Sequence, residues 1–190
     1  AIRAEIEQAK KDGKIITASR ALGALLGIAP EDPADWRDFA AQLLKVPPAN
    51  DGEKRDLPAE ASSAAINAYL RTESGARDQA VTLDLLAQAL GRRGMWKEAI
   101  KTWRLALTYR DDAATRTALD KAVAEHGFRV VSNTVDADSE TPRMCIVFSD
   151  PLPVADPRLT DFVVVEGGAG FAIEPQDNQI CVDGLKHGQR

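Results

Sequence analysis

The side chains best suited to chemistry in this sequence are two histidines and two cysteines. His126 falls at the end of a helical pattern, where an imidazole interacts with the last carbonyl groups and the helix dipole, and His187 falls in a turn. No cluster of cysteines or carboxylates at metal-ligand spacing accompanies either histidine. The segment GGAG, 167–170, lies between two predicted strands, so it is predicted to be a turn and not a phosphate-binding loop. We therefore predict no enzyme, no metal site and no cofactor.

The two cysteines lie in two separate predicted strands, RMCIVFS and QICVDG. Alternation along these strands places Cys145 and Cys181 on the faces opposite their large apolar neighbours, so the two thiols share a parity. Two strand thiols of the same parity can form a disulfide if the strands are adjacent. The alternative hypothesis is that each cysteine is a small buried apolar side chain, as free cysteines often are. The residues alone leave both hypotheses open.

The elements that hold these residues divide into two regions of different composition. Residues 1–127 are rich in Ala, Leu and Arg and carry 19 basic and 19 acidic residues, whereas residues 128–190 carry 5 basic and 10 acidic residues, which gives the net charge of -5. A neutral first region and an acidic second region argue against nucleic acid as a partner, because its phosphates would need a basic face. No run approaches the about 18 apolar residues of a membrane-spanning helix. The sequence predicts two domains, 1–127 and 128–190.

Apolar residues in the first domain recur with helical spacing and in pairs, with a repeat of about 34 residues. The clearest pair is LDLLAQALGRRGMWKEAIKTWRLALTYRD, 83–111, which resembles the tetratricopeptide consensus. Small residues in such a pair let two helices cross closely, and large apolar residues fill the space around them. The small positions are Ala87, Ala99 and Ala106, and the large ones are Leu83, Trp96 and Trp103. We expect all three tryptophans, Trp36, Trp96 and Trp103, to be largely buried between paired helices.

The same register predicts a partial repeat at the amino terminus and a second repeat that begins at the helix cap Asp32. The second helix of that repeat comes late, because Ala65 and Tyr69 fit places that a plain repeat would put at positions 52 and 56, an excess of 13 residues. The excess falls in VPPANDGEKRDLPAE, 46–60, which is polar and contains prolines and is predicted to be an exposed loop. A last helix over about 113–125 is predicted to cap the array.

In the second domain the hydrophobic period changes from 3.6 to 2. Five strands are predicted, FRVVSNTV, RMCIVFS, DFVVVE, FAIE and QICVDG. Short strands separated by turns favour an antiparallel sandwich, and five strands are too few to close one. The predicted fold class is α+β with segregated parts, a tetratricopeptide-like helical array followed by an incomplete antiparallel β-sandwich of macroglobulin or immunoglobulin type.

Four segments of the sequence carry a further resemblance. They are HGFRV, PRMCIVFSDPL, DFVVVEGG and QICVDGLKHGQR. They resemble the first macroglobulin-type domain of bacterial alpha-2-macroglobulins, in which a strand ending in Phe-Ser leads into a loop and a later strand runs into Gly-Leu-x-x-Gly. In alphaproteobacterial members of that family a helical stretch lies ahead of this domain. The order of parts is therefore similar.

This resemblance implies a leading segment of a periplasmic protease-trapping inhibitor, with membrane anchoring of the full-length protein as one option. Neither Cys145 nor Cys181 stands in the C-x-E-Q thioester motif of the family, and no bait region is recognisable. The thioester and the bait are therefore expected outside this chain. The implied partners are the remaining domains of the parent protein and, through the intact protein, target proteases. An oxidising compartment would also keep a disulfide between the two cysteines stable.

The alternative hypothesis is an independent tetratricopeptide adaptor with an immunoglobulin-like module that binds a peptide or an envelope protein. The repeat register predicts groove positions on the first helices of the second and third repeats. Those chosen as candidate ligands are Arg37, Lys45, Asp84, Gln88 and Arg92. The three basic residues would attract a peptide carboxylate and Asp84 would repel it. A basic helical face is interpreted as a solvated surface rather than a docking patch; it consists of Arg92, Arg93, Lys97, Lys101 and Arg104.

Overall fold

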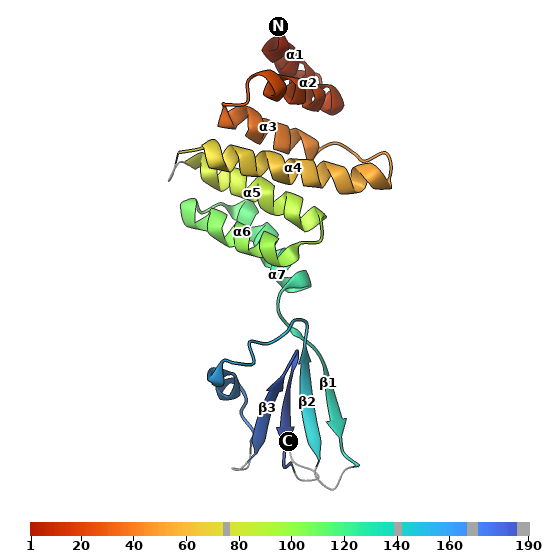
Figure 1. Cartoon of the computed structure of the whole chain (residues 1–190), viewed down its shortest axis with the longest axis vertical. Coiled ribbons are helices and arrows are strands. Elements are labelled where there is room, and N and C mark those ends of the chain that lie inside the picture. Colours follow the sequence, from red (N-terminus) through yellow and green to blue (C-terminus); the bar gives the residue numbers. More distant parts are fainter. Residues whose placement is uncertain (74–76, 139–141, 167–170, 186–190) are drawn as a thin grey trace. The chain divides into compact units, whose positions relative to one another are not determined.

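The computed structural model describes residues 1–73, 77–138, 142–166 and 171–185. The chain divides into two compact units, Ala1–His126 and Gly127–Arg190, one residue before the predicted boundary (Figure 1). The first unit is helical and the second contains a β-sheet. The predicted GGAG turn and His187 lie outside the described residues.

The described part of the helical unit contains seven helices, each packed against the next along the chain. They are α1 (Ile2–Lys11), α2 (Ile15–Ile28), α3 (Pro33–Leu43), α4 (Asp51–Arg71), α5 (Arg77–Arg92), α6 (Trp96–Tyr109) and α7 (Ala113–His126). In addition α3 contacts α5, so the first helix of the pair α3–α4 is a neighbour of the first helix of the pair α5–α6. This is the arrangement predicted from the paired periodicity.

Local sequence explains where several helices begin. Asp32 caps α3 by accepting a hydrogen bond of 2.9 Å from the Ala34 N–H, and Pro33 occupies the first helical position. The turns between paired helices use Gly13 (φ 67°) and Gly94 (φ 75°), which adopt a backbone conformation that other residues rarely reach.

Two apolar clusters hold the array together. The larger joins α1 to α5 around residues such as Leu22, Leu26 and Phe39, and the smaller joins α5, α6 and α7 around Trp103. Trp103 is 5% exposed, which agrees with the expectation that it fills the space between helices.

The other two tryptophans are partly buried. Trp36 packs against the larger apolar cluster and Trp96 against the smaller one, and both are more exposed than Trp103. The indole of Trp36 donates a hydrogen bond of 2.6 Å to the Pro30 carbonyl, and Trp96 stacks on His126 with ring centroids 3.7 Å apart.

The prediction of an exposed loop over 46–60 holds for 46–50 and is wrong from Asp51 onwards. Helix α4 begins at Asp51 because Asn50 accepts a hydrogen bond of 2.9 Å from the Glu53 N–H, while the Glu53 carboxylate accepts one of 2.8 Å from the Ala49 N–H. This reciprocal capping starts the helix early, although Pro58 within it cannot donate a helical hydrogen bond. The inserted residues therefore lengthen α4, and its first turns project past α3 and α5 (Figure 1).

The β unit contains one antiparallel sheet of four strands within its described residues. The strands are β1 (Val130–Asp136), β2 (Arg143–Phe148), β3 (Ala172–Gln176) and β4 (Gln179–Asp183), in the order β1-β2-β4-β3. A hairpin turn at Asp177, with φ 49°, joins β3 to β4. The predicted second layer of a sandwich is not found among the described residues, so macroglobulin or immunoglobulin topology is not reproduced there.

The predicted strand DFVVVE, 161–166, is also wrong. Its first two residues end a 3₁₀ helix, η1 (Pro157–Phe162), and 163–166 pair with no strand in the described part of the sheet. Asp156 caps η1 by accepting a hydrogen bond of 3.0 Å from the Arg158 N–H, with Pro157 in the first position. After η1 the backbone of Val163 is extended, but without a neighbouring strand the valines form no part of the described sheet.

Candidate protein-binding surfaces of the helical unit

The five groove residues predicted from the repeat register mostly join helices of the array to one another. Arg37 of α3 forms an ion pair with Asp78 of α5, with an N–O distance of 3.0 Å. Arg92, at the end of α5, donates a hydrogen bond of 2.5 Å to the carbonyl of Leu44, just after α3. Both arginines therefore join the second repeat to the third through contacts within the chain.

Asp84 acts in the same way at the contact between α5 and α6, and Gln88 supports it from within α5. The Asp84 carboxylate accepts hydrogen bonds from the Trp103 indole (2.9 Å) and from the Gln88 amide (2.7 Å). Lys45, which is exposed, remains the predicted residue with no such contact among the described residues. The five residues are thus spread over the contact between α3 and α5, the contact between α5 and α6, and a hollow lined by Lys45. They do not meet in a single pocket.

Lys45 lines a hollow of about 430 Å³ between α1 and α3. An ion pair between Lys10 and Asp38 crosses this hollow, and Lys10 also pairs with Glu7. Burial opposes the charge of Lys10, but hydrogen bonds and charges from Asp38 and Glu7 raise its pKa above the ordinary value. Most of the charge in this hollow is therefore neutralised within the chain.

A second hollow, of about 160 Å³, lies between α5 and α7. Asp112 accepts hydrogen bonds from the Thr115 N–H at 3.1 Å and from Arg110 at 2.6 Å. These two contacts, the backbone one first, lower the pKa of Asp112 below its usual value. Here too the acid and the base satisfy each other, and the volume of the hollow lies below the about 300 to 1,000 Å³ of ligand sites.

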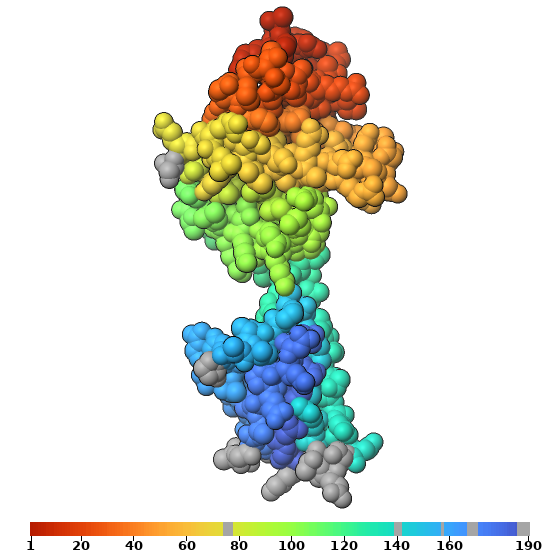
Figure 2. Space-filling view, in the orientation of Figure 1, coloured from red at the N-terminus to blue at the C-terminus, as the bar shows by residue number. Residues whose placement is uncertain are grey.

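The third depression is different, because its charged side chains lie mainly along one wall. It is a groove of about 450 Å³ between α2, α3 and the projecting first turns of α4, which form the orange overhang in Figure 2. Its volume falls in the range of ligand sites, about 300 to 1,000 Å³. We call this depression the α2–α4 groove. The residues that line it are Ile16, Ser19, Arg20, Gly23, Phe39, Leu43, Val46, Pro47, Ala49, Glu53, Asp56, Leu57 and Glu60.

Sequence analysis missed this groove because the segment that builds one wall was predicted to be a loop. The signal that could have found it is Asn50 followed three residues later by Glu53, a capping box. Once α4 is extended to Asp51, Glu53, Asp56 and Glu60 fall on one helical face.

Comparison with known proteins supports the fold of the helical unit. No protein-family model and no curated protein sequence matches the chain. Among solved structures, the Arabidopsis OM64 TPR domain is similar, with a TM-score of 0.54 and 14% identity over 65% of this chain and 93% of that domain. The N-terminal domain of stress-induced protein-1 from C. elegans has a TM-score of 0.49 and 13% identity over 64% of this chain and 91% of that domain.

The helical unit is a tetratricopeptide-type array. At this identity the likeness establishes the fold and carries no ligand with it. The predicted basic face lies on the end of α5, the following turn and α6, and its side chains are exposed.

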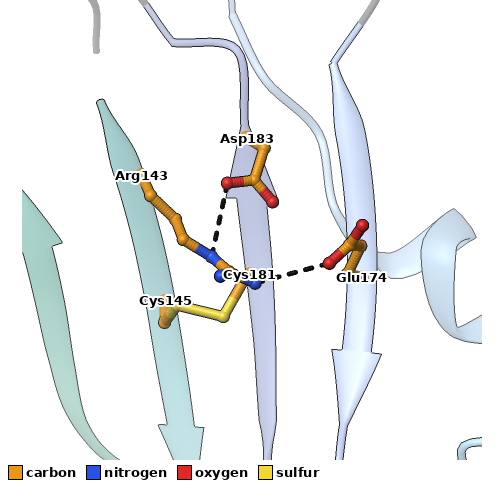
Figure 3. Close-up of a disulfide and its surroundings, with 5 residues drawn as sticks. All are labelled: Arg143, Cys145, Glu174, Cys181 and Asp183. Carbon is orange, nitrogen blue, oxygen red and sulfur yellow. Dashed lines mark hydrogen bonds and ion pairs between the residues drawn. A yellow bond between two sulfur atoms is a disulfide. The ribbon is translucent and has the colours of Figure 1, made fainter. Parts of the chain in front are cut away.

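In the β unit a disulfide joins Cys145 of β2 to Cys181 of β4, which are direct partners in the sheet register (Figure 3). Both cysteines are buried. Arg143 lies beside the disulfide and pairs with Asp183 at 3.3 Å and Glu174 at 3.4 Å, so it joins β2, β4 and β3. The disulfide and this arginine tie the sheet together on one face.

In the described ranges no group of three or more His, Cys, Asp and Glu side chains is placed to hold a metal ion. Among the helices described here, none combines the length and apolar character needed to cross a membrane.

Proposed function

We propose that this chain is an adaptor whose helical unit binds a segment of a protein partner without catalysing a reaction. The observation that carries the proposal is the α2–α4 groove, an open depression of about 450 Å³ on a tetratricopeptide-type array. In an array of stacked helical repeats each repeat contacts only its neighbours, so the stack is elongated. Such stacks commonly offer an extended surface to which a partner binds. The β unit, cross-linked by its disulfide, would be a second and separate module.

A partner bound in the groove would contact three helices at once. The floor is formed by Phe39 and Leu43 of α3, which are 8% and 4% exposed. One wall comes from α2 and the other from the extension of α4. Burying an apolar side chain against this floor is favourable by roughly 25 cal/mol for each Å² removed from water. Such contacts would add to the affinity for a peptide, after the cost of ordering it has been met.

The binding proposal is tested by selecting short random peptides displayed on phage against the immobilised full chain, and measuring the enriched peptides by fluorescence anisotropy. Gly23 provides a matched pair of variants, because a Cβ there would lie 3.6 Å from the Phe39 ring, an ordinary contact. Gly23→Ala should therefore bind normally, whereas Gly23→Leu should fill the groove and weaken binding. If selection enriches no peptide that binds the native chain, the adaptor proposal is wrong.

The alpha-2-macroglobulin hypothesis remains a narrower proposal, together with the periplasmic location and the target proteases that it implies. It rests on the four sequence segments alone, and one of them, DFVVVEGG, begins at the end of η1 rather than as a strand. The adaptor interpretation is preferred because the array has a structural counterpart. Sequencing the gene downstream of this segment tests the narrower proposal: a long continuation containing C-x-E-Q is expected, and a stop codon within one more domain would exclude it.

A further inference from the structure

The α4 wall of the α2–α4 groove carries an excess of negative charge. Glu53, Asp56 and Glu60 line it, and the opposite wall contributes one basic residue, Arg20. All the other lining residues are uncharged. A ligand in this groove therefore meets three carboxylates and one guanidinium.

Helix capping accounts for only the first of these acids. The Glu53 carboxylate accepts a hydrogen bond from the Ala49 N–H and lies in the first turn, where a negative charge also favours the helix dipole. Asp56 and Glu60 lie beyond that turn, where the dipole effect has faded. They stand four residues apart on one helix, a spacing at which like charges repel each other.

Neither Asp56 nor Glu60 is neutralised by the protein itself. Both side chains are exposed, and within the described residues neither has an ion-pair or hydrogen-bond partner. This distinguishes the groove from the α1–α3 hollow, where Lys10 and Asp38 form an ion pair. The two carboxylates are thus available to a cation supplied from outside the chain.

Apart from Ser19 and Arg20, the rest of the groove is apolar. Phe39 and Leu43 form the floor, Leu57 is half-buried beside it, and Ile16 is 47% exposed at the rim. A peptide that fits this surface needs an apolar side chain to pack on the floor. It also needs a positively charged side chain close enough to reach the carboxylates of the α4 wall.

We propose that the α2–α4 groove binds a peptide segment in which an apolar side chain is flanked by Lys or Arg. The apolar side chain packs on Phe39 and Leu43, and the basic side chain pairs with Asp56 and Glu60. This inference rests on the proposed adaptor function and adds the chemistry of the partner. The groove exists because the insertion lengthens α4, so a plain tetratricopeptide repeat would lack the acidic wall.

The test uses the full chain and the peptides selected on phage, together with two double variants of equal charge change. Asp56→Lys with Glu60→Lys reverses the wall. Glu98→Lys with Asp120→Lys makes the same change at exposed positions of α6 and α7 outside the groove. All four substitutions are on exposed helix surfaces, where they should leave the fold intact.

We expect the selected peptides to be enriched in Lys or Arg beside an apolar residue. Binding should weaken about tenfold in the wall variant, stay within about twofold in the control variant, and weaken as NaCl rises from about 0.05 to 0.5 M. Selected peptides that lack basic residues, or that bind the wall variant as well as the native chain, would overturn this inference while leaving the adaptor proposal intact. Failure to select any binding peptide would overturn both.

Discussion

Replacing Trp103 is the sharpest test of how the helical array is held together. Trp103 is 5% exposed and packs against Ala87, Ala99 and Ala122, which belong to three different helices. Its indole also donates a hydrogen bond to Asp84. Trp103→Ala removes both contributions, and truncation of a buried tryptophan costs about 3 to 5 kcal/mol of the free energy of unfolding.

The expected change in melting temperature follows from the size of the helical unit, Ala1–His126. An unfolding entropy of about 2.1 cal/mol/K per residue gives about 0.26 kcal/mol/K for this unit, so Trp103→Ala should lower Tm by roughly 11 to 19 °C. Trp103→Phe keeps most of the packing but loses the hydrogen bond. Because Asp84 is half-exposed and keeps its bond from Gln88, that variant should lose only about 1 to 2 kcal/mol.

Thermal unfolding followed by far-ultraviolet circular dichroism measures these changes, since the signal comes mainly from the helices. Leu105→Ala is the matched control, because Leu105 is on the same helix but is 42% exposed. Its Tm should fall by only a few degrees. A Tm for Trp103→Ala that equals the Tm of Leu105→Ala would refute the assignment of Trp103 as the residue that joins α5, α6 and α7.

Three further predictions concern the disulfide, the cap of α4 and the cap of α7. Alkylation under denaturing, non-reducing conditions should label neither Cys145 nor Cys181, and reduction should destabilise the β unit by about 3 to 4 kcal/mol for a bridge between residues 36 apart in sequence. Asn50→Ala should lower the stability of the helical unit by about 1 kcal/mol, measured by urea unfolding, because it removes the bond to the Glu53 N–H. The pKa of Asp112 in the folded protein is below its ordinary value of 3.8. The ionised carboxylate therefore stabilises the folded protein fully above the ordinary pKa, and this contribution is lost as the pH falls through the lower folded-state pKa. Asp112→Asn should therefore show a smaller loss of Tm on acidification below about pH 4 than the native chain.

Each of these predictions has a contrary result. Two alkylated thiols in the unreduced protein would exclude the disulfide. Unchanged urea unfolding of Asn50→Ala, compared with Lys54→Ala as an exposed control, would show that the capping box does not stabilise α4. Parallel acid-unfolding curves for native and Asp112→Asn chains would show that this carboxylate titrates alike in the folded and unfolded states.

Short-range sequence patterns were sufficient to predict the local structure wherever one local preference had no strong competitor. The pairing of helices followed from apolar spacing, and the start of α3 followed from Asp32 and Pro33. The shared parity of the two cysteines also followed from alternation along their strands. That β2 and β4 are adjacent, however, is a matter of sheet order, which no spacing within a strand reports.

Two predictions failed for different reasons. The polar and proline-containing stretch 46–60 suggested a loop, yet the cap at Asn50 and Glu53 starts a helix at Asp51. The valines of DFVVVE suggested a strand, yet the residues before them form η1 and the valines meet no neighbouring strand in the described sheet. A cap is local, whereas a strand needs a partner that lies elsewhere in the chain.

The sequence by itself determined the local elements of the helical unit and its tetratricopeptide-type character, because apolar periodicity and caps act between residues close in the chain. Only the tertiary structure decided which charged residues are free. Arg37 and Asp84 looked like ligands in the repeat register, but contacts with Asp78 and Trp103, on other helices, satisfy them. Asp56 is left without such a partner and faces the groove. Pairing of charges between helices depends on how the helices pack, so the sequence could indicate the early start of α4 through Asn50 and Glu53 but not which acidic residues stay unpaired.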